Sequence, residues 1–224
     1  MRPETRWHAL ALALIVAMYT ASVALYPRLP ARVPMHWGID GQPDGWGGPG
    51  SVFLMPTVAL GVWALMVFLP RFDPGKANYP SFAGAYALLR TAVIGLLALV
   101  HGASLAAALG QPLDMGRVIS PALGVLYILV GGLMGKIRPN WFVGVRTPWT
   151  LTSKLSWTRT HRATGWLFVG VGVLALVADL FSSKAALVAI VGGALLTAVF
   201  SMVYSHHVWA RDPDRQSPGG TTPA

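Results

Sequence analysis

The chain has 224 residues, of which 54% are hydrophobic and only 11% are charged. Soluble domains carry roughly 25% charged residues, so this composition excludes a soluble protein with an ordinary solvated surface and indicates an integral membrane protein. The absence of Cys excludes disulfides, thiol catalysis and thiolate metal sites. The formal net charge of +9 is typical of topogenic residues and contacts with anionic lipid headgroups, and we expect no direct nucleic-acid contact.

Six apolar segments follow one another along the chain, and each is about long enough to cross ~30 Å of hydrocarbon as a helix. We expect these spans at about 7–26, 52–69, 82–109, 118–134, 165–180 and 185–204. The fifth is short, and we expect it to continue from a helix that begins before the membrane. Because irregular backbone cannot face lipid, the predicted fold class is an all-α polytopic membrane protein with six transmembrane helices.

The basic residues predict the orientation of these helices. If the long loop 135–165 is cytoplasmic, both termini are cytoplasmic as well. The residues on the outside are then Arg28, Arg32, Arg117 and Lys184, and the other thirteen of the 17 Lys and Arg are inside. This bias follows the positive-inside rule and predicts an N-in, C-in protein of the inner, cytoplasmic membrane.

Three regions are predicted along the chain. Residues 1–84 form an N-terminal membrane domain with an outer loop at 27–50, and residues 85–205 form a four-helix membrane domain with an inner loop at 135–165. The polar, Pro- and Gly-rich segment 206–224 is expected to be a disordered cytoplasmic tail. Small residues within the later spans are expected to pack helices closely inside one molecule, namely Gly131, Gly135, Gly170, Gly172, Gly192 and Gly193.

The outer loop is dense in Pro and Gly, which predicts an ordered series of turns rather than a helix. Trp37 and Trp46 suit the membrane–water interface. Between them, His36, Asp40 and Asp44 are spaced four and four. They could ligate a divalent metal or perform acid–base chemistry. The alternative, favoured by Asp preceding Gly, is that both carboxylates cap turns while His36 is buried against Trp37.

The inner loop combines basic, aromatic, Gly and Pro residues, and the whole stretch between Asp114 and Asp179 contains no acidic residue. Thr152 or Ser153 is a plausible N-cap for a new helix. On that helix Trp157 and His161 are i,i+4 neighbours, and Arg162 lies on the adjoining face. These groups are therefore expected to converge where the helix enters the membrane.

Two interpretations of the inner loop stay open. Its charge and Trp residues fit topology and headgroup binding alone, whereas the close packing of its Gly, Pro and Asn fits a folded motif that docks a partner or forms a gate. Arg146 could anchor a carboxylate or phosphate. His161 could respond to pH, although a structural role is favoured. Within the spans, His101 is a functional candidate or a neutral side chain bonded to Ser104 or to another helix.

The two loops together resemble the SdpI family. The outer loop resembles the N-terminal membrane domain of unknown function found in that family, through Pro34, His36, Trp37, Gly41, Pro43, Asp44 and Trp46. The inner loop is similar to the SdpI signature itself, through Asn140, Gly144, Arg146, Thr147, Pro148, Trp149, Trp157, His161 and Arg162. These two sets are the candidate binding residues; no catalytic or metal-binding residue and no cofactor are predicted.

The resemblance implies a multi-pass bacterial membrane protein that gives immunity to a secreted antimicrobial toxin. It also implies signalling, in which toxin outside leads to recruitment of a cytoplasmic regulator inside. Family members often carry acidic residues after the Ser that starts the second inner helix, whereas Lys154 and Leu155 follow Ser153 here. The partner of this basic loop is therefore expected to present acidic surface. A small transporter or exporter using His101, and a metal-dependent membrane enzyme using the outer loop, are the alternative functions.

Overall fold

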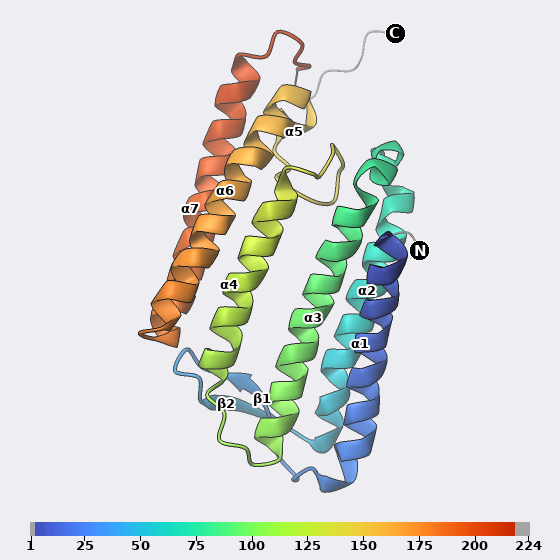
Figure 1. Cartoon of the computed structure of the whole chain (residues 1–224), viewed down its shortest axis with the longest axis vertical. Coiled ribbons are helices and arrows are strands. Elements are labelled where there is room, and N and C mark those ends of the chain that lie inside the picture. Colours follow the sequence, from blue (N-terminus) through green and yellow to red (C-terminus); the bar gives the residue numbers. More distant parts are fainter. Residues whose placement is uncertain (1–2, 218–224) are drawn as a thin grey trace.

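The computed structural model describes residues 3–217, and its long helices are the expected six. They are α1 (Pro3–Leu25), α2 (Leu54–Phe72), α3 (Ala83–Ala108), α4 (Met115–Met134), α6 (Lys154–Asp179) and α7 (Ser183–Ala210). All six are long and apolar enough to cross a membrane, so the chain is an all-α polytopic membrane protein. The start of α1 and the end of α7 lie toward the same end of the bundle (Figure 1), as six spans require; N-in, C-in stays a prediction.

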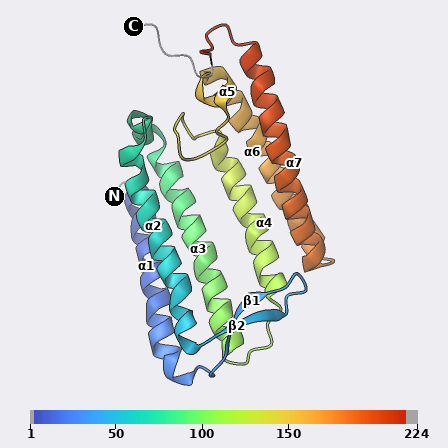
Figure 2. The ribbon, with the colours of Figure 1, turned by 180° about the vertical axis from the view of Figure 1, so that it is seen from behind.

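The helices form two groups. α1, α2 and α3 pack together, as do α4, α6 and α7, and the groups meet where α3 lies beside α4 (Figures 1 and 2). The core of the first group is apolar, and it is formed by Ala11, Ile15, Met18, Ala59 and Ile94. A second cluster joins both groups at the end that carries the loop 135–147; it contains Tyr79, Phe82, Tyr86, Met134, Ile137 and Trp157.

Glycines set the close approach of α4 and α6. A Cβ built on Gly131 would lie 2.5 Å from the carbonyl oxygen of Gly165, so any side chain there would force the helices apart. The expected packing within one molecule is therefore confirmed at Gly131, and also at Gly172 and Gly193. An added Cβ meets ordinary contact or open space at the remaining three positions, Gly135, Gly170 and Gly192.

Side chains cap the first turn of α6 and of a short helix that precedes it. Ser153 is the N-cap of α6 and accepts the N–H of Ser156 at 2.9 Å. This confirms the predicted cap and shows that the fifth span continues a helix that begins at Lys154, well before residue 165. The short helix α5 (Pro148–Leu151) was not predicted. It forms because Pro suits the first helical position and Thr147 caps it with an extended backbone.

The outer loop contains more than turns. Strands β1 (Val33–Trp37) and β2 (Pro43–Gly47) pair antiparallel, and 3-10 helices at Tyr26–Arg28 and Pro49–Phe53 flank them. The prediction of turns alone was wrong, because β1 buries Val33 against the end of α3, while the turn between the strands, with Gly41 at φ 76°, lets them pair. Figure 2 shows this hairpin beneath α3 and α4.

The predicted disordered tail needs correction over its first part. Helix α7 continues to Ala210, and the chain then turns back along the inner loop. The backbone N–H of Gln216 donates to the carbonyl oxygen of Thr152 at 2.9 Å, and the hydroxyl of Ser153 donates to the carboxylate of Asp212. These bonds order the segment because they satisfy backbone and cap groups that would otherwise be solvated. The rest of that prediction, 218–224, lies outside the described residues.

Candidate functional site

The outer hairpin presents an exposed His–Asp pair. Nδ1 of His36 lies 2.5 Å from Oδ1 of Asp44, and the two side chains are 73% and 53% exposed. The register explains the pairing, because His36 faces Gly45 across the ladder and Asp44 is the neighbouring residue on β2. The prediction that His36 is buried against Trp37 was therefore wrong: the pairing of β1 with β2 shifts register on both sides of His36, and Met35 and His36 are both exposed.

The other candidate residues of the outer loop have structural roles, because they cap a turn or pack against the rest of the protein. Asp40 accepts the backbone N–H of Gln42 at 3.1 Å, which confirms that it caps a turn. Gly41 packs so closely on α4 that an added Cβ would lie 2.3 Å from Oδ1 of Asp114, the N-cap of that helix. Pro34 is buried, and Trp37 and Pro43 are half-buried. Among the described residues, no three His, Cys, Asp or Glu side chains gather as metal ligands.

Trp46 is the exposed aromatic of the hairpin. It is 50% exposed, and the guanidinium of Arg32 lies 5.8 Å from its ring centroid. A cation over an indole face is a favourable contact, and it places a positive charge beside an apolar ring. The hairpin thus offers both charged and aromatic groups on the face away from the helices.

At the opposite end, Asn140 organises the inner loop. Its side chain is buried, and its Oδ1 accepts the N–H groups of Phe142 and Val143 at 2.9 and 2.7 Å. Its Nδ2 donates to the carbonyl oxygens of Arg138 and Val143 at 2.9 and 3.0 Å. One amide therefore supplies four hydrogen bonds to a tight loop, for which an Asn is well suited because it both donates and accepts.

His161 joins this loop to α6. The backbone N–H of Val145 donates to Nε2 of His161 at 3.1 Å, so Nε2 carries no proton and Nδ1 donates to the carbonyl oxygen of Trp157 at 2.8 Å. The imidazole is buried and stacks on the indole of Trp157 with ring centroids 4.1 Å apart. Both nitrogens are satisfied in the neutral form, which supports the structural role for His161.

Gly144 makes that contact possible. Its φ of 111° lies in the region that L side chains rarely adopt, and an added Cβ would stand 2.3 Å from Nε2 of His161. Trp157 completes the arrangement, because its indole N–H donates to the carbonyl oxygen of Ile137 at 3.0 Å. Gly144, Trp157 and His161 of the inner motif are thus brought together in one unit.

Thr147, Pro148 and Trp149 link the loop to α7. The hydroxyl of Thr147 accepts the N–H of Thr150 at 3.2 Å as a cap, and donates to the hydroxyl of Ser205 at 3.0 Å. Pro148 begins α5, and the ring of Trp149 meets His206 edge-on with centroids 5.0 Å apart. These three residues therefore fasten the inner motif to the last helix.

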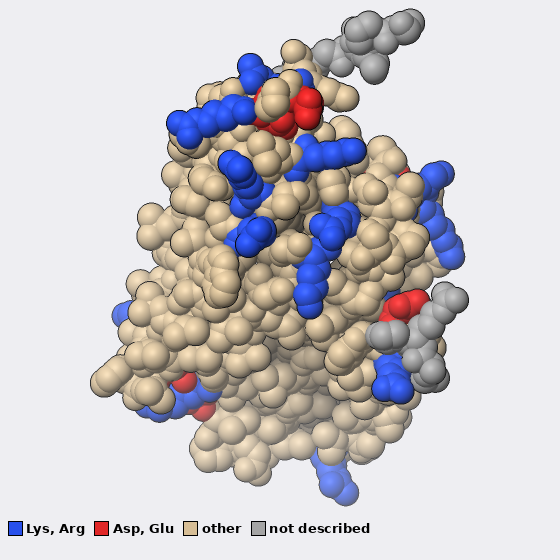
Figure 3. Space-filling model, turned by 45° about the horizontal axis from the view of Figure 1, so that its top comes forward, with Lys and Arg blue, Asp and Glu red and all other residues tan. Residues whose placement is uncertain are grey.

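Arg146 and Arg162 stay at the surface. One N–H of the Arg146 guanidinium donates to the carbonyl oxygen of Trp141 at 2.8 Å, and the side chain is exposed. Arg162 lies beside Gly135 on an exposed side of α6 rather than with Trp157 and His161, so the expected convergence is wrong for the guanidinium. Figure 3 shows Lys and Arg spread over this end of the molecule.

His101 lies in the interface of α1 and α3. Its Nε2 is 3.0 Å from the hydroxyl of Ser22 and 3.2 Å from the carbonyl oxygen of Met18, both on α1. Ser104 instead donates to the carbonyl oxygen of Val100. The alternative of a neutral side chain bonded to another helix is therefore the one that the contacts support.

The structure adds two carboxylates that sequence reasoning missed. Asp73 is buried and accepts the N–H of Trp141 at 3.1 Å, the N–H of Gly75 at 2.6 Å and the hydroxyl of Tyr79 at 2.8 Å. It docks the α2–α3 connection onto the inner loop. An Asp before Pro–Gly does predict a turn, but the contact to Trp141 spans 68 residues and has no local signal.

Asp212 is the second. It accepts a hydrogen bond from Ser153, the N-cap of α6. The first turn of α6 contains no acidic residue of its own, so the C-terminal segment supplies a carboxylate there. Donation from the Ser153 hydroxyl, followed by the N–H of Asp214, holds the pKa of Asp212 below its usual value. A polar cleft opens here between the α2–α3 connection, α6 and the C-terminal segment, and its walls include Asn78, Arg138, Lys154, Asp212 and Asp214.

In comparisons with known proteins, the region with the inner loop and the region with the outer loop match two different family models. Residues 136–205 match the SdpI/YfhL protein family, and residues 13–60 match a domain of unknown function, DUF1648. The resemblance to the SdpI family is confirmed. The SdpI match contains the inner motif and α6, and the other match contains the outer hairpin, while the predicted boundary at 84/85 stays a prediction.

A curated relative covers nearly the whole chain. The immunity protein SdpI of Bacillus subtilis (strain 168) is 23% identical over 198 residues, which are 88% of this chain and 93% of the relative. No solved structure matches. The similarity to this relative therefore extends over both membrane regions. The SdpI immunity family is not a known enzyme family.

Proposed function

We propose that this SdpI-like chain gives its cell immunity to a secreted antimicrobial toxin and signals its presence, from the cytoplasmic membrane and without catalysis. The observation that carries the proposal is the similarity to the immunity protein SdpI over 88% of the chain. It covers both regions that hold the unusual loops, so the resemblance extends beyond a shared pattern of apolar helices.

The outer hairpin is the proposed contact for the toxin. It lies on the outer side of the predicted topology and exposes the His36–Asp44 pair together with Trp46. Met35 and Ile39 are also exposed, at 41% and 53%. Such a mixture of apolar and charged groups at a membrane surface suits an amphipathic peptide, whose apolar face and charges can be matched at once.

The inner end is the proposed contact for a cytoplasmic regulator. The segment 136–162 contributes six Lys and Arg and no acid, and several of these side chains are exposed. Opposite charge favours encounter between partners, so the regulator is expected to present acidic surface. The position of Asp212 supports this choice, because one acidic side chain of the chain itself already lies against the start of α6.

The test is protection of a sensitive bacterial host. Cells that produce the chain are challenged with a panel of purified, secreted membrane-active peptide toxins, and survival is compared with an empty vector at equal protein abundance. We expect protection against at least one toxin, and its loss in His36→Ala, Asp44→Ala and Arg146→Ala. Gln42→Ala is the matched control, because that exposed side chain belongs to the same hairpin.

The outcomes separate the parts of the proposal. Survival no better than with the empty vector across the panel would contradict the immunity function. Full protection by His36→Ala and Asp44→Ala would remove the hairpin as the toxin contact while leaving immunity in place. Because His36 and Asp44 form one pair, the double variant is expected to lose no more than either single variant.

A further inference from the structure

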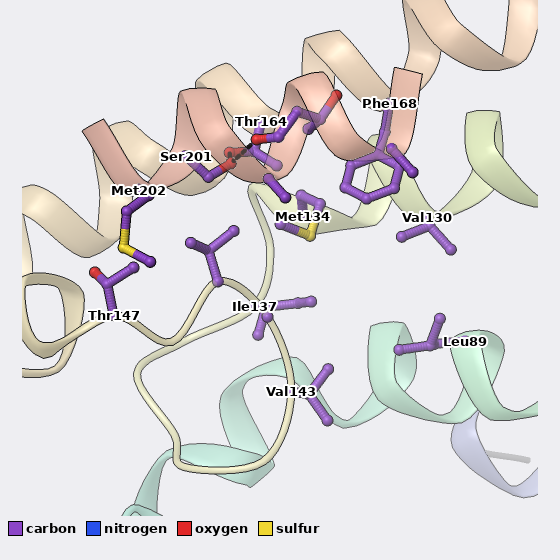
Figure 4. A pocket seen from close by; sticks show the side chains of 15 residues that line it. Leu89, Val130, Met134, Ile137, Val143, Thr147, Thr164, Phe168, Ser201 and Met202 are labelled. Carbon is purple, nitrogen blue, oxygen red and sulfur yellow. Dashed lines mark hydrogen bonds between the residues drawn. The ribbon is translucent and has the colours of Figure 1, made fainter. Parts of the chain in front are cut away.

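An apolar cavity of ≈ 390 Å³ lies beneath the inner loop. α3, α4, α6 and α7 form its sides, and the loop residues Val143, Gly144 and Val145 cover its inner end. Figure 4 shows Leu89 facing it from α3 and Met202 from α7. The size lies within the ~300–1,000 Å³ range of small-ligand sites. Part of the family motif therefore roofs a cavity that the proposed immunity function does not use.

Three of the four hydroxyl groups that line the cavity, those of Thr147, Thr164 and Ser201, are already bonded within the protein. Thr164 and Ser201 share a hydrogen bond of 2.8 Å, and Ser201 donates to the carbonyl oxygen of Thr197 at 2.7 Å. Thr147 donates to Ser205 at 3.0 Å. A polar ligand would find few free partners here and would lose its hydration, so the part of a ligand that enters the cavity must be apolar.

The cavity is open on its α7 side. Ala198 and Met202 belong to its lining and are exposed, and both lie on a helix that spans the membrane. Their exposed surface therefore faces lipid rather than water. An acyl chain of the surrounding bilayer is the apolar group nearest to this opening, and it can enter without crossing water.

A cation stands beside the roof. Arg146 lies between the lining residues Val145 and Thr147 and is exposed, with one N–H bonded to the carbonyl oxygen of Trp141. Its other N–H groups are free to meet an anion, and a guanidinium binds phosphate well. Lys136 and Arg138 add exposed positive charge to the same loop, which contains no acid.

We propose that this cavity holds one acyl chain of an anionic phospholipid, with the lipid phosphate at Arg146. The apolar lining and its bonded hydroxyls select the chain, the opening on α7 admits it, and the charge of the loop selects an anionic headgroup. The acyl chain then fills the space beneath the inner motif, which contains both the loop residues that cover the cavity and His161. The proposal does not rest on the immunity function, although both assign a role to Arg146, and the variants at Leu89 and Ala198 test the lipid alone.

The test is lipid retention by the purified full chain. The protein is reconstituted with equal amounts of phosphatidylglycerol and phosphatidylcholine and released into the gas phase for native mass spectrometry. We expect one phosphatidylglycerol to be retained in preference. Ala198→Trp and Leu89→Trp fill the cavity from opposite sides and should abolish retention, while Arg146→Ala should weaken it about fivefold, the effect of one basic residue near a membrane surface.

Two matched variants control for effects of an added Trp or a lost charge that do not depend on the cavity or on Arg146. Val199→Trp introduces the same side chain one residue along α7, at an exposed position outside the cavity. Arg159→Ala removes an exposed inner-end charge that lines none of the described cavities. Both should retain lipid as the unaltered chain does. Unchanged retention in both cavity-filling variants, with normal helix content by circular dichroism, would overturn the site. Equal retention of both lipids, unaffected by Arg146→Ala, would overturn the anionic headgroup.

Discussion

Gly144 lies against His161 so closely that a single added carbon would stand 2.3 Å from the imidazole Nε2. The contact joins the inner loop to α6, because the same nitrogen accepts the N–H of Val145. The backbone at Gly144 adopts φ 111° to reach it. The inner motif is therefore built around an approach that only glycine permits.

Gly144→Ala is expected to destabilise the protein. The strain at positive φ and the clash with His161 together should cost about 1–3 kcal/mol, measured as a lower midpoint of thermal unfolding in detergent. Gly110→Ala is the matched control, because Gly110 also has positive φ, 86°, but open space around an added Cβ. Equal losses in the two variants would show that the contact with His161 contributes nothing.

Gly131→Ala should separate α4 from α6, because its Cβ would meet the carbonyl oxygen of Gly165 at 2.5 Å. Overpacking of this kind costs about 1–3 kcal/mol. The neighbouring Gly132→Ala has nothing within 4 Å of its Cβ and should leave stability unchanged or raise it slightly. The measurement is again the midpoint of thermal unfolding, and a larger loss at Gly132 would contradict the described packing.

Asp73→Ala should release the α2–α3 connection from the inner loop. It leaves the N–H of Trp141 and the hydroxyl of Tyr79 without their acceptor, at a cost of about 1–3 kcal/mol for each buried donor. Hydrogen exchange by mass spectrometry should speed up in the peptide that contains Trp141. Asp40→Ala, which removes an exposed turn-capping carboxylate, should leave exchange in that peptide unchanged; faster exchange there would contradict a specific role for Asp73.

The docked C-terminal segment should open in acid. The pKa of Asp212 is lowered in the folded chain by the donations from Ser153 and Asp214. A lowered pKa stabilises the fold above the unfolded value of about 3.9 and loses that effect as the pH falls through the folded value. Exchange of the Gln216 amide, corrected for its intrinsic rate, should therefore rise below about pH 4. In Asp212→Asn this pH dependence should vanish; its persistence would point to another group.

The predicted orientation is testable with reporters placed in the two long loops. Alkaline phosphatase fused after Gly45 should be active, because the outer hairpin is predicted outside, whereas green fluorescent protein fused after Pro148 should fluoresce inside. The opposite fusions at the same positions are the controls. Signals that place both loops on one side would contradict the six-span N-in, C-in arrangement.

The helices could be predicted from sequence because lipid imposes a local rule: a span must be apolar and must satisfy its own backbone. The cap at Ser153 and the turn at Asp40 also follow local rules, since each side chain bonds its own neighbourhood. The inner residues Asn140 and Gly144 were found as a motif through their resemblance to the SdpI signature, and only Asn140 acts mainly within its own loop.

Only the tertiary structure decides which residues far apart along the chain contact each other. The sequence marked His36 and Asp44 as candidates, but the register of β1 and β2 paired them in solvent. The contacts of Asp73 with Trp141 and of Asp212 with Ser153 span 68 and 59 residues. No local pattern encodes such pairs, because they depend on which helix ends the packing of the whole bundle brings together.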